Sequence, residues 1–230
     1  MFLKKNGLTR KQRTEKLLQG FNISINPNLP EIKSEDNVSI KSPEEIVRRA
    51  VTAFITAQIA IDICNDNGAA ESAEFFTPIM ERFGLMGELT DDEKVYFNLS
   101  ECDNISKGEA CQIEWRLEMC IPLFWACGFW KKIEFPSEMT DTSKLITLIG
   151  GCESFDELMS HVKMRTASEI LDGADAAFRM DWACVEARIK NDKSISGQLS
   201  HDVVVEQHKG FNWLIGAYDA EDWDSVKPHT

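Results

Sequence analysis

The chain has 230 residues, 27% of them charged and 43% in the hydrophobic set, a composition typical of a soluble globular protein rather than of a disordered or membrane protein. Its 38 acidic and 25 basic residues leave a formal net charge of −13, which disfavours binding to nucleic acid phosphates and to anionic lipid. We therefore expect neither a nucleic acid nor a membrane as a partner.

The first 20 residues form a basic arm, which we treat separately from the helical domain expected over residues 21–230. The arm contains one acidic residue and six basic residues, which are Lys4, Lys5, Arg10, Lys11, Arg13 and Lys16. A helix is predicted from Thr9, a typical N-cap, to Gln19, because Gly20 favours a stop. We expect the arm to fold back on the acidic body or to stay solvated; docking on a polyanion is the other interpretation.

Residues 21–41 are predicted to be extended, because Pro27 and Pro30 exclude a helix and the asparagines favour turns. The segment also carries apolar side chains that need a surface to cover them, namely Phe21, Ile23, Ile25, Leu29 and Ile32. We therefore expect it to wrap around the body rather than to act as a free linker.

A long helix is predicted to begin after Ser42, where the sequence gives a clear N-terminal signal. Ser42 is the N-cap, Pro43 occupies the first helical position, and Glu45 completes a capping box. The helix extends to about Cys64 and is apolar on most sides, which predicts a place at the centre of the fold.

The rest of the chain also shows helical patterns. Helices are predicted over residues 69–83, 90–99, 106–127, 142–149, 154–160, 167–190 and 200–215. Pro122 is expected to kink the helix over 106–127 after Cys120. No stretch shows the sustained alternation of a strand, and no repeat is visible, so an all-α single compact domain without a substantial sheet is predicted.

The seven cysteines are an odd number and include no CxxC pair. The N-terminal residues lack the apolar region and the cleavage site of a signal peptide, so we expect reduced thiols and a cytoplasmic location. The longest uncharged runs, residues 50–61 and 119–130, are shorter than the roughly 20 residues of a membrane-spanning helix.

Residues 167–190 combine an apolar helical stripe with charged side chains along its flank. The stripe consists of Leu171, Ala174, Phe178, Trp182, Val185 and Ile189. Asp175, Arg179 and Glu186 follow one side of it, and the first two have the spacing of an ion pair within a helix. Arg179 could receive a carboxylate or phosphate beside Trp182; the alternative, which we favour, is a structural ion pair that orients helices.

The penultimate helix adds Glu206 and His208 to these candidate polar residues. Glu206 and His208 are two positions apart and therefore face about 160° apart on a helix, so they cannot bind one metal ion together. We expect them to take part in packing.

The C-terminal residues are predicted to form a clasp over this helix. Trp213 points away from the main apolar face, and Trp223 is expected to cover it. Asp222 and Asp224 would cap a helix end or accept hydrogen bonds from Arg179. A recognition peptide for a partner is the alternative interpretation.

Motifs for metal binding and catalysis are missing from the sequence. Glu71 and Glu74 form the only ExxE pair in a predicted helix, with Asp62 and Asp66 upstream, and no second pair supports a metal site. GxSxG, a glycine-rich phosphate loop and a cysteine next to a histidine are absent. We therefore predict no metal and no cofactor.

Four segments of the chain, at residues 10–32, 42–60, 170–191 and 203–230, resemble a bacterial family known as domain-of-unknown-function family 4272. The most specific marks are the NPNLP turn, the D-x3-R-x2-WA helix and the closing WD…T pattern, and residues 114–129 give a weaker match. The resemblance implies no activity, since none is assigned to the family.

The chain departs from this family at Gln207, where the V-V-x-E-R pattern implies an arginine. Gln207 lies on the apolar face of its predicted helix, with Val204, Phe211 and Leu214. Any role that the resemblance implies for that arginine is therefore in doubt here.

These observations favour a non-catalytic binding protein whose acidic surface receives a basic protein partner. One protein of this kind would be an immunity-type protein that neutralises a basic toxin. The alternative is an enzyme of unknown class with a polar pocket around Asp175, Arg179, Trp182 and Glu206, at least three of which would converge on one cavity. The sequence predicts neither an activity nor an oligomeric state.

Overall fold

The computed structural model describes residues 7–220 and 222–230, which form helices and connecting segments and contain no strand. The α-helices are α1 (Arg10–Gly20), α2 (Pro43–Cys64), α3 (Ala69–Arg82), α4 (Asp91–Lys94), α5 (Lys107–Glu114), α6 (Arg116–Ala126), α7 (Ser143–Gly151), α8 (Phe155–Ser160), α9 (Ala167–Lys190) and α10 (His201–Leu214). The predicted all-helical fold is confirmed. None of the helices in these residues is long and apolar enough to cross a membrane.

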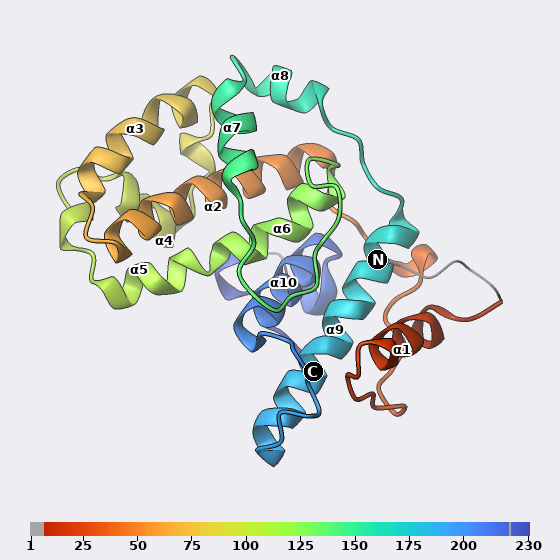
Figure 1. The fold of residues 1–230 in the computed structure, drawn as a ribbon. Helices are drawn as coiled ribbons and strands as arrows, with labels where there is room; N and C mark the ends of the chain where they lie inside the picture. Colours follow the sequence, from red (N-terminus) through yellow and green to blue (C-terminus); the bar gives the residue numbers. More distant parts are fainter. Residues whose placement is uncertain (1–6, 221) are drawn as a thin grey trace.

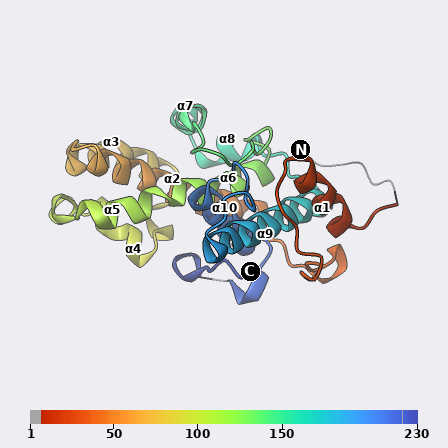
Figure 2. The ribbon, with the colours of Figure 1, turned by 60° about the horizontal axis from the view of Figure 1, so that its bottom comes forward.

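The helices α2, α6, α9 and α10 form the centre of the molecule. α10 packs against α6 and α9, while α2 packs against α3, α5 and α6 (Figure 1). α2 is buried on most sides, as its apolar sequence predicted. Seen from below, α1 lies on the outer side of α9, away from α3 and α5 (Figure 2).

The helix starts follow the capping residues of the sequence. The hydroxyls of Thr9, Ser42, Ser106 and Thr166 each accept a hydrogen bond from the backbone three residues on, and a Gln or Glu at that position bonds back in every case. These reciprocal bonds satisfy N–H groups that have no partner within the helix. This local chemistry explains why α1, α2 and α9 begin where the sequence predicted.

The helix predicted over 90–99 is shorter in the structure. α4 ends at Lys94, and a 3-10 turn, Val95–Phe97, follows it. Asn98 then leaves the helical region, and its side-chain oxygen accepts a hydrogen bond from the backbone N–H of Ser100 at 3.2 Å. An asparagine that bonds its own backbone in this way competes with helix formation.

The predicted kink after Cys120 is wrong in its position. The helix over 106–127 is interrupted at Trp115, between α5 and α6, whereas Pro122 lies inside α6. A proline disturbs the carbonyl four residues before it, here that of Glu118. The N–H of Glu118 bonds to the carbonyl of Trp115 at 3.0 Å, a 3-10 spacing, and this break at Trp115 lies about two turns before the proline.

The apolar stripe of α9 is buried over its first half only. Leu171, Ala174 and Phe178 are buried, whereas Ile189 is 71% exposed. The C-terminal turns of α9 extend beyond the neighbouring helices (Figure 1). The sequence pattern predicted a buried face but not where the partner helices end.

α10 approaches α6 closely because it carries Gly210 at the contact. A Cβ at this position would lie 2.2 Å from the carbonyl oxygen of Met119 and 3.2 Å from the ring of Pro122. Backbone atoms of a packed helix cannot withdraw to make room, so only glycine fits.

We predict that Gly210→Ala lowers the free energy of unfolding by about 2 kcal/mol or more, through overpacking of the α6 and α10 contact. Urea unfolding followed by circular dichroism measures this change. Gly150→Ala in α7 is the matched control, since no atom lies within 4 Å of its Cβ, and it should raise stability by about 0.5 kcal/mol. Equal effects of the two substitutions would contradict the packing argument.

Candidate functional site

Asp175 and Arg179 form a fully buried ion pair on α9. The guanidinium donates through Nε and one terminal nitrogen to the two carboxylate oxygens, both at 3.0 Å. It also donates to the carbonyl of Pro30 at 3.0 Å and lies 3.7 Å from the carboxylate of Glu15. The pair therefore joins α9 to the wrapping segment and lies beside α1, while the second terminal nitrogen of Arg179 is buried without a hydrogen-bond partner among the described residues.

The other charged residues predicted for this network have separate partners. Glu186 binds Lys190 at 2.6 Å near the exposed end of α9, while Glu206 binds Lys209 at 2.5 Å on α10. Burial raises the pKa of Glu206, and Lys209 opposes that rise. Trp182 is half-buried against a small apolar cluster beneath α1. None of these residues lines a cleft described below.

His208 forms a second buried pair, with Asp181 across the contact between α9 and α10. Its Nδ1 is 2.9 Å from a carboxylate oxygen, which also accepts a hydrogen bond from the Thr230 hydroxyl at 3.3 Å. His208 lines a cavity of about 180 Å³ together with Phe178 and Asn212. Within the described chain no serine, threonine or cysteine side chain is hydrogen-bonded to this imidazole, so a nucleophile and base pair is not assembled.

The predicted C-terminal clasp residues bind to α10 and α6. The rings of Trp213 and Trp223 meet edge to face with centroids 5.4 Å apart, and both are buried. Asp222 accepts a hydrogen bond from the backbone N–H of Asp224 at 3.1 Å. The Asp224 carboxylate is 2.6 Å from Arg116 rather than near Arg179.

Gln207 donates to a buried carboxylate of α6. Its side-chain amide is 2.9 Å from Glu118, which also accepts from the backbone N–H of Thr140 at 2.5 Å. Glu118 thus has neutral donors at the position where the family resemblance implies an arginine. The amide satisfies a buried carboxylate that an apolar residue would leave short of donors.

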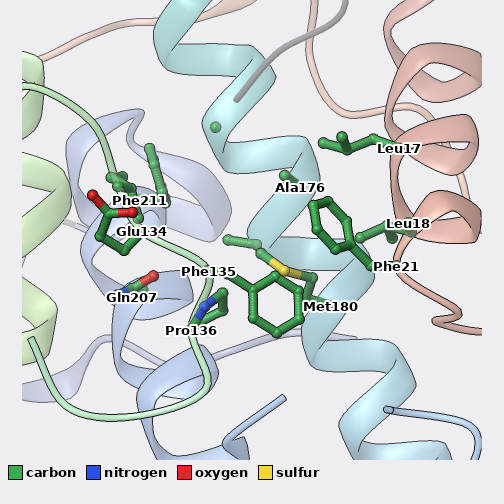
Figure 3. A pocket seen from close by; sticks show the side chains of 13 residues that line it. Leu17, Leu18, Phe21, Glu134, Phe135, Pro136, Ala176, Met180, Gln207 and Phe211 are labelled. Carbon is green, nitrogen blue, oxygen red and sulfur yellow. The ribbon is translucent and has the colours of Figure 1, made fainter. Parts of the chain in front are cut away.

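Gln207 also borders a small apolar pocket between α1, α9, α10 and residues 133–136 (Figure 3). The rings of Phe21 and Phe135 pack together beside this space with centroids 5.0 Å apart, and Leu18 and Met180 lie next to them (Figure 3). Its volume of about 50 Å³ leaves room for a few methyl groups and not for a metabolite. It is a packing defect under α1 rather than a ligand site.

A larger cleft, of about 440 Å³, opens between α4 and α5. We call it the acidic cleft and define it by its lining residues, which are Asp91, Asp92, Val95, Tyr96, Glu101, Asn104, Ile105, Glu109, Gln112, Ile113 and Arg116. Four carboxylates therefore surround a single arginine. The net charge of the cleft is therefore negative, like that of the whole chain.

Arg116 is already neutralised within the acidic cleft. Its guanidinium is 2.8 Å from Asp92 and 2.6 Å from Asp224, and only 12% of its side chain is exposed. The pKa of Asp91 is lowered by its hydrogen bond with Lys94, and that of Glu109 by its hydrogen bonds with Ser106. Both carboxylates are therefore charged at neutral pH. Asp91 is paired with Lys94 at 2.6 Å and Asp92 with Arg116, so the negative balance of the cleft comes from Glu101 and Glu109.

The floor of the acidic cleft is apolar. Tyr96 and Ile113 are buried there, and Ile105 is half-buried. Burial raises the pKa of Tyr96, which keeps its hydroxyl neutral. An apolar floor with a carboxylate rim suits a ligand that is apolar along its length and positively charged at its end.

Sequence reasoning missed the residues of this cleft. Asp92 and Glu109 were visible only as acidic residues in the first turns of predicted helices, where such residues are common. Glu101 lies in a segment without a regular pattern. Their convergence depends on the turn at Asn98, which no spacing rule predicts.

A family model described as Domain of unknown function (DUF4272) matches residues 10–226. The resemblance predicted from the sequence is thereby confirmed over nearly the whole chain. No curated protein and no solved structure matches the chain.

We predict that Arg179→Met destabilises the fold by about 3–5 kcal/mol, because Asp175 would remain buried without a cation. Chemical unfolding measures the loss. Lys190→Met on the same helix removes an exposed pair with Glu186 and should cost about 0.5 kcal/mol or less. Replacing both members, Asp175→Leu with Arg179→Met, should cost less than Arg179→Met alone; a larger cost for the double variant would argue against this interpretation.

Proposed function

The chain belongs to the family described as Domain of unknown function (DUF4272), and we propose that it is a non-catalytic binding protein that holds a basic segment of a partner protein in the acidic cleft. The observation that carries this proposal is the concentration of four carboxylates around a cleft of about 440 Å³. Its single arginine is already paired.

The geometry suits a lysine or arginine side chain of the partner. The aliphatic stem would lie on Val95 and Ile105, and the charged head would reach the rim at Glu101 or Glu109. The net charge of −13 would speed the approach of a basic protein over longer distances. A basic toxin neutralised by this surface is one form that the partner could take.

A cytoplasmic location forms part of this proposal. All seven cysteines are free thiols in the structure. Reduced thiols are typical of the cytosol, where a binding protein that is not secreted would meet its partners.

The enzymatic alternative has less support. Asp175 and Arg179 are bonded to each other, and Glu206 is bonded to Lys209. The Asp175 and Arg179 pair is therefore separate from Glu206, and none of the three residues lines the acidic cleft. The Asp181 and His208 pair could act as a base, but without a hydrogen-bonded nucleophile it does not define a reaction.

We predict that Glu101→Lys weakens binding of lysine- and arginine-containing peptides by about tenfold, because it replaces attraction at the rim with repulsion. An array of basic peptides selects the probe, and calorimetry at physiological salt then measures its affinity for the protein and its variants. Glu101 is exposed, so the fold should tolerate the change.

Glu74→Lys on α3 is the matched control, since it changes the net charge equally at an exposed position outside the cleft. It should leave the affinity within about twofold of the original at physiological salt, where distant charges are screened. If both variants weaken binding equally, the peptides respond to the overall charge and the cleft proposal fails. The same conclusion follows if no basic peptide binds more tightly than an acidic one.

A further inference from the structure

Three side chains with metal-binding chemistry meet where the end of α2 packs against α5. They are Cys64, Cys111 and Glu114, and their potential ligand atoms all lie within 4.8 Å of one another. The two sulfur atoms are 3.3 Å apart. Cys64 is the last residue of α2, and the other two residues are on α5.

Helix geometry brings this cluster together. Cys111 and Glu114 are three residues apart, which places them on one face of α5. α5 packs against α2 (Figure 1), and this contact brings the sulfur of Cys64 to within 3.3 Å of that of Cys111. Cys111 is exposed and the other two residues are half-buried, so an ion can reach the cluster from solvent.

Without a cation, the cluster favours neutral thiols. Burial, the neighbouring thiol of Cys111 and the carboxylate of Glu114 raise the pKa of Cys64 to about 12. Thiolates and a carboxylate at this separation repel one another, and a divalent cation between them would reverse that repulsion.

We propose that Cys64, Cys111 and Glu114 bind a thiophilic divalent cation of the Zn²⁺ class, with two sulfur ligands, one carboxylate oxygen and a fourth position open to solvent. Sulfur ligands select Zn²⁺ over Mg²⁺ and Ca²⁺, which take oxygen ligands. Three protein ligands with an open position are typical of accessible zinc sites. The bound ion would clamp the end of α2 to α5.

The required adjustment is small. Two sulfur ligands at about 2.3 Å from a tetrahedral Zn²⁺ are about 3.8 Å apart, so the sulfurs must separate by about half an ångström. The exposed side chain of Cys111 can move by this amount. A disulfide would instead need the sulfurs to approach to about 2.05 Å, and it would make no use of Glu114.

Proton release provides one signature of the site. Each thiol loses its proton as it binds the cation, so one Zn²⁺ displaces two protons from the two cysteines. The affinity should therefore rise by up to about 100-fold per pH unit below the pKa values of the thiols. A site made of carboxylates alone would show no such dependence near neutral pH.

The test uses the full, reduced chain and titrates it with Co²⁺ and Zn²⁺. We expect one Co²⁺ per chain, with the near-ultraviolet absorption of cobalt bound to thiolate, which Zn²⁺ then displaces. Cys64→Ser and Cys111→Ser each keep one of the two sulfur ligands, so each should weaken the thiolate band to about half or less and lower the affinity at least about tenfold. Glu114→Gln should keep the band and bind about tenfold more weakly.

Cys152→Ser is the matched control. The thiol of Cys152 donates to the carbonyl of Leu148 at 3.3 Å, a bond that serine can also form, and the residue is remote from α5 in sequence. This variant should bind Co²⁺ as the original chain does. A reduced chain without a thiolate band, or a band that keeps its full intensity in both Cys64→Ser and Cys111→Ser, would overturn the proposal.

Oxidation gives a separate readout. If Cys64 and Cys111 instead form a disulfide under mild oxidants, the chain loses two hydrogen atoms and two titratable thiols, and both losses vanish in Cys64→Ser. That result, together with the absence of Co²⁺ binding by the reduced chain, would replace the metal site with a redox pair. Retained binding of basic peptides in these variants would show that the acidic cleft stands independently of the cluster.

Discussion

The close contact of α10 with α6 is the constraint on which the rest of the structure depends. Gly210 lets the two backbones approach until a side chain would meet the carbonyl of Met119. At this separation the side chains beside Gly210 reach deep into the core, where Gln207 bonds to Glu118 and His208 to Asp181. The apolar contact places the polar groups. The bond between Gln207 and Glu118 then fixes the register of α10 on α6, and the His208 and Asp181 pair fixes that of α10 on α9, since buried donors and acceptors must be paired.

Two ion pairs, one buried and one partly exposed, tie the wrapping segment and the C-terminal residues to this centre. Asp175 and Arg179 fasten the wrapping segment through the carbonyl of Pro30, and Arg116 fastens the C-terminal residues through Asp224. Such pairs give little net stability over apolar packing, but a missing partner is costly. They therefore favour one arrangement of these segments over others that would cover the same apolar surface.

Much of the fold could be predicted from the sequence because it depends on local chemistry. The capping boxes at Ser42 and Thr166 set the starts of the longest helices, and the apolar content of α2 indicated its central place. The Asp175 and Arg179 pair followed from spacing along one helix. The acidic cleft and the cysteine cluster could not be predicted, because both need distances between segments. Cys64 and Cys111 are 47 residues apart, and the turn at Asn98 is held by hydrogen bonds from the backbone and the hydroxyl of Ser100 to the Asn98 side chain.

α5 connects the two proposed sites. On a helix with 100° between residues, Glu109 and Gln112 lie on roughly the opposite side from Cys111 and Glu114. α5 has only eight residues, which is too short for a stable helix in isolation, so packing against α2 must hold it in place. The positions of the rim carboxylates and of the cysteine sulfurs thus follow from the same packing. An ion that clamps α5 to α2 would bind the packed arrangement in preference to the separated one, and would stabilise the wall of the acidic cleft by linkage, without contacting a ligand there.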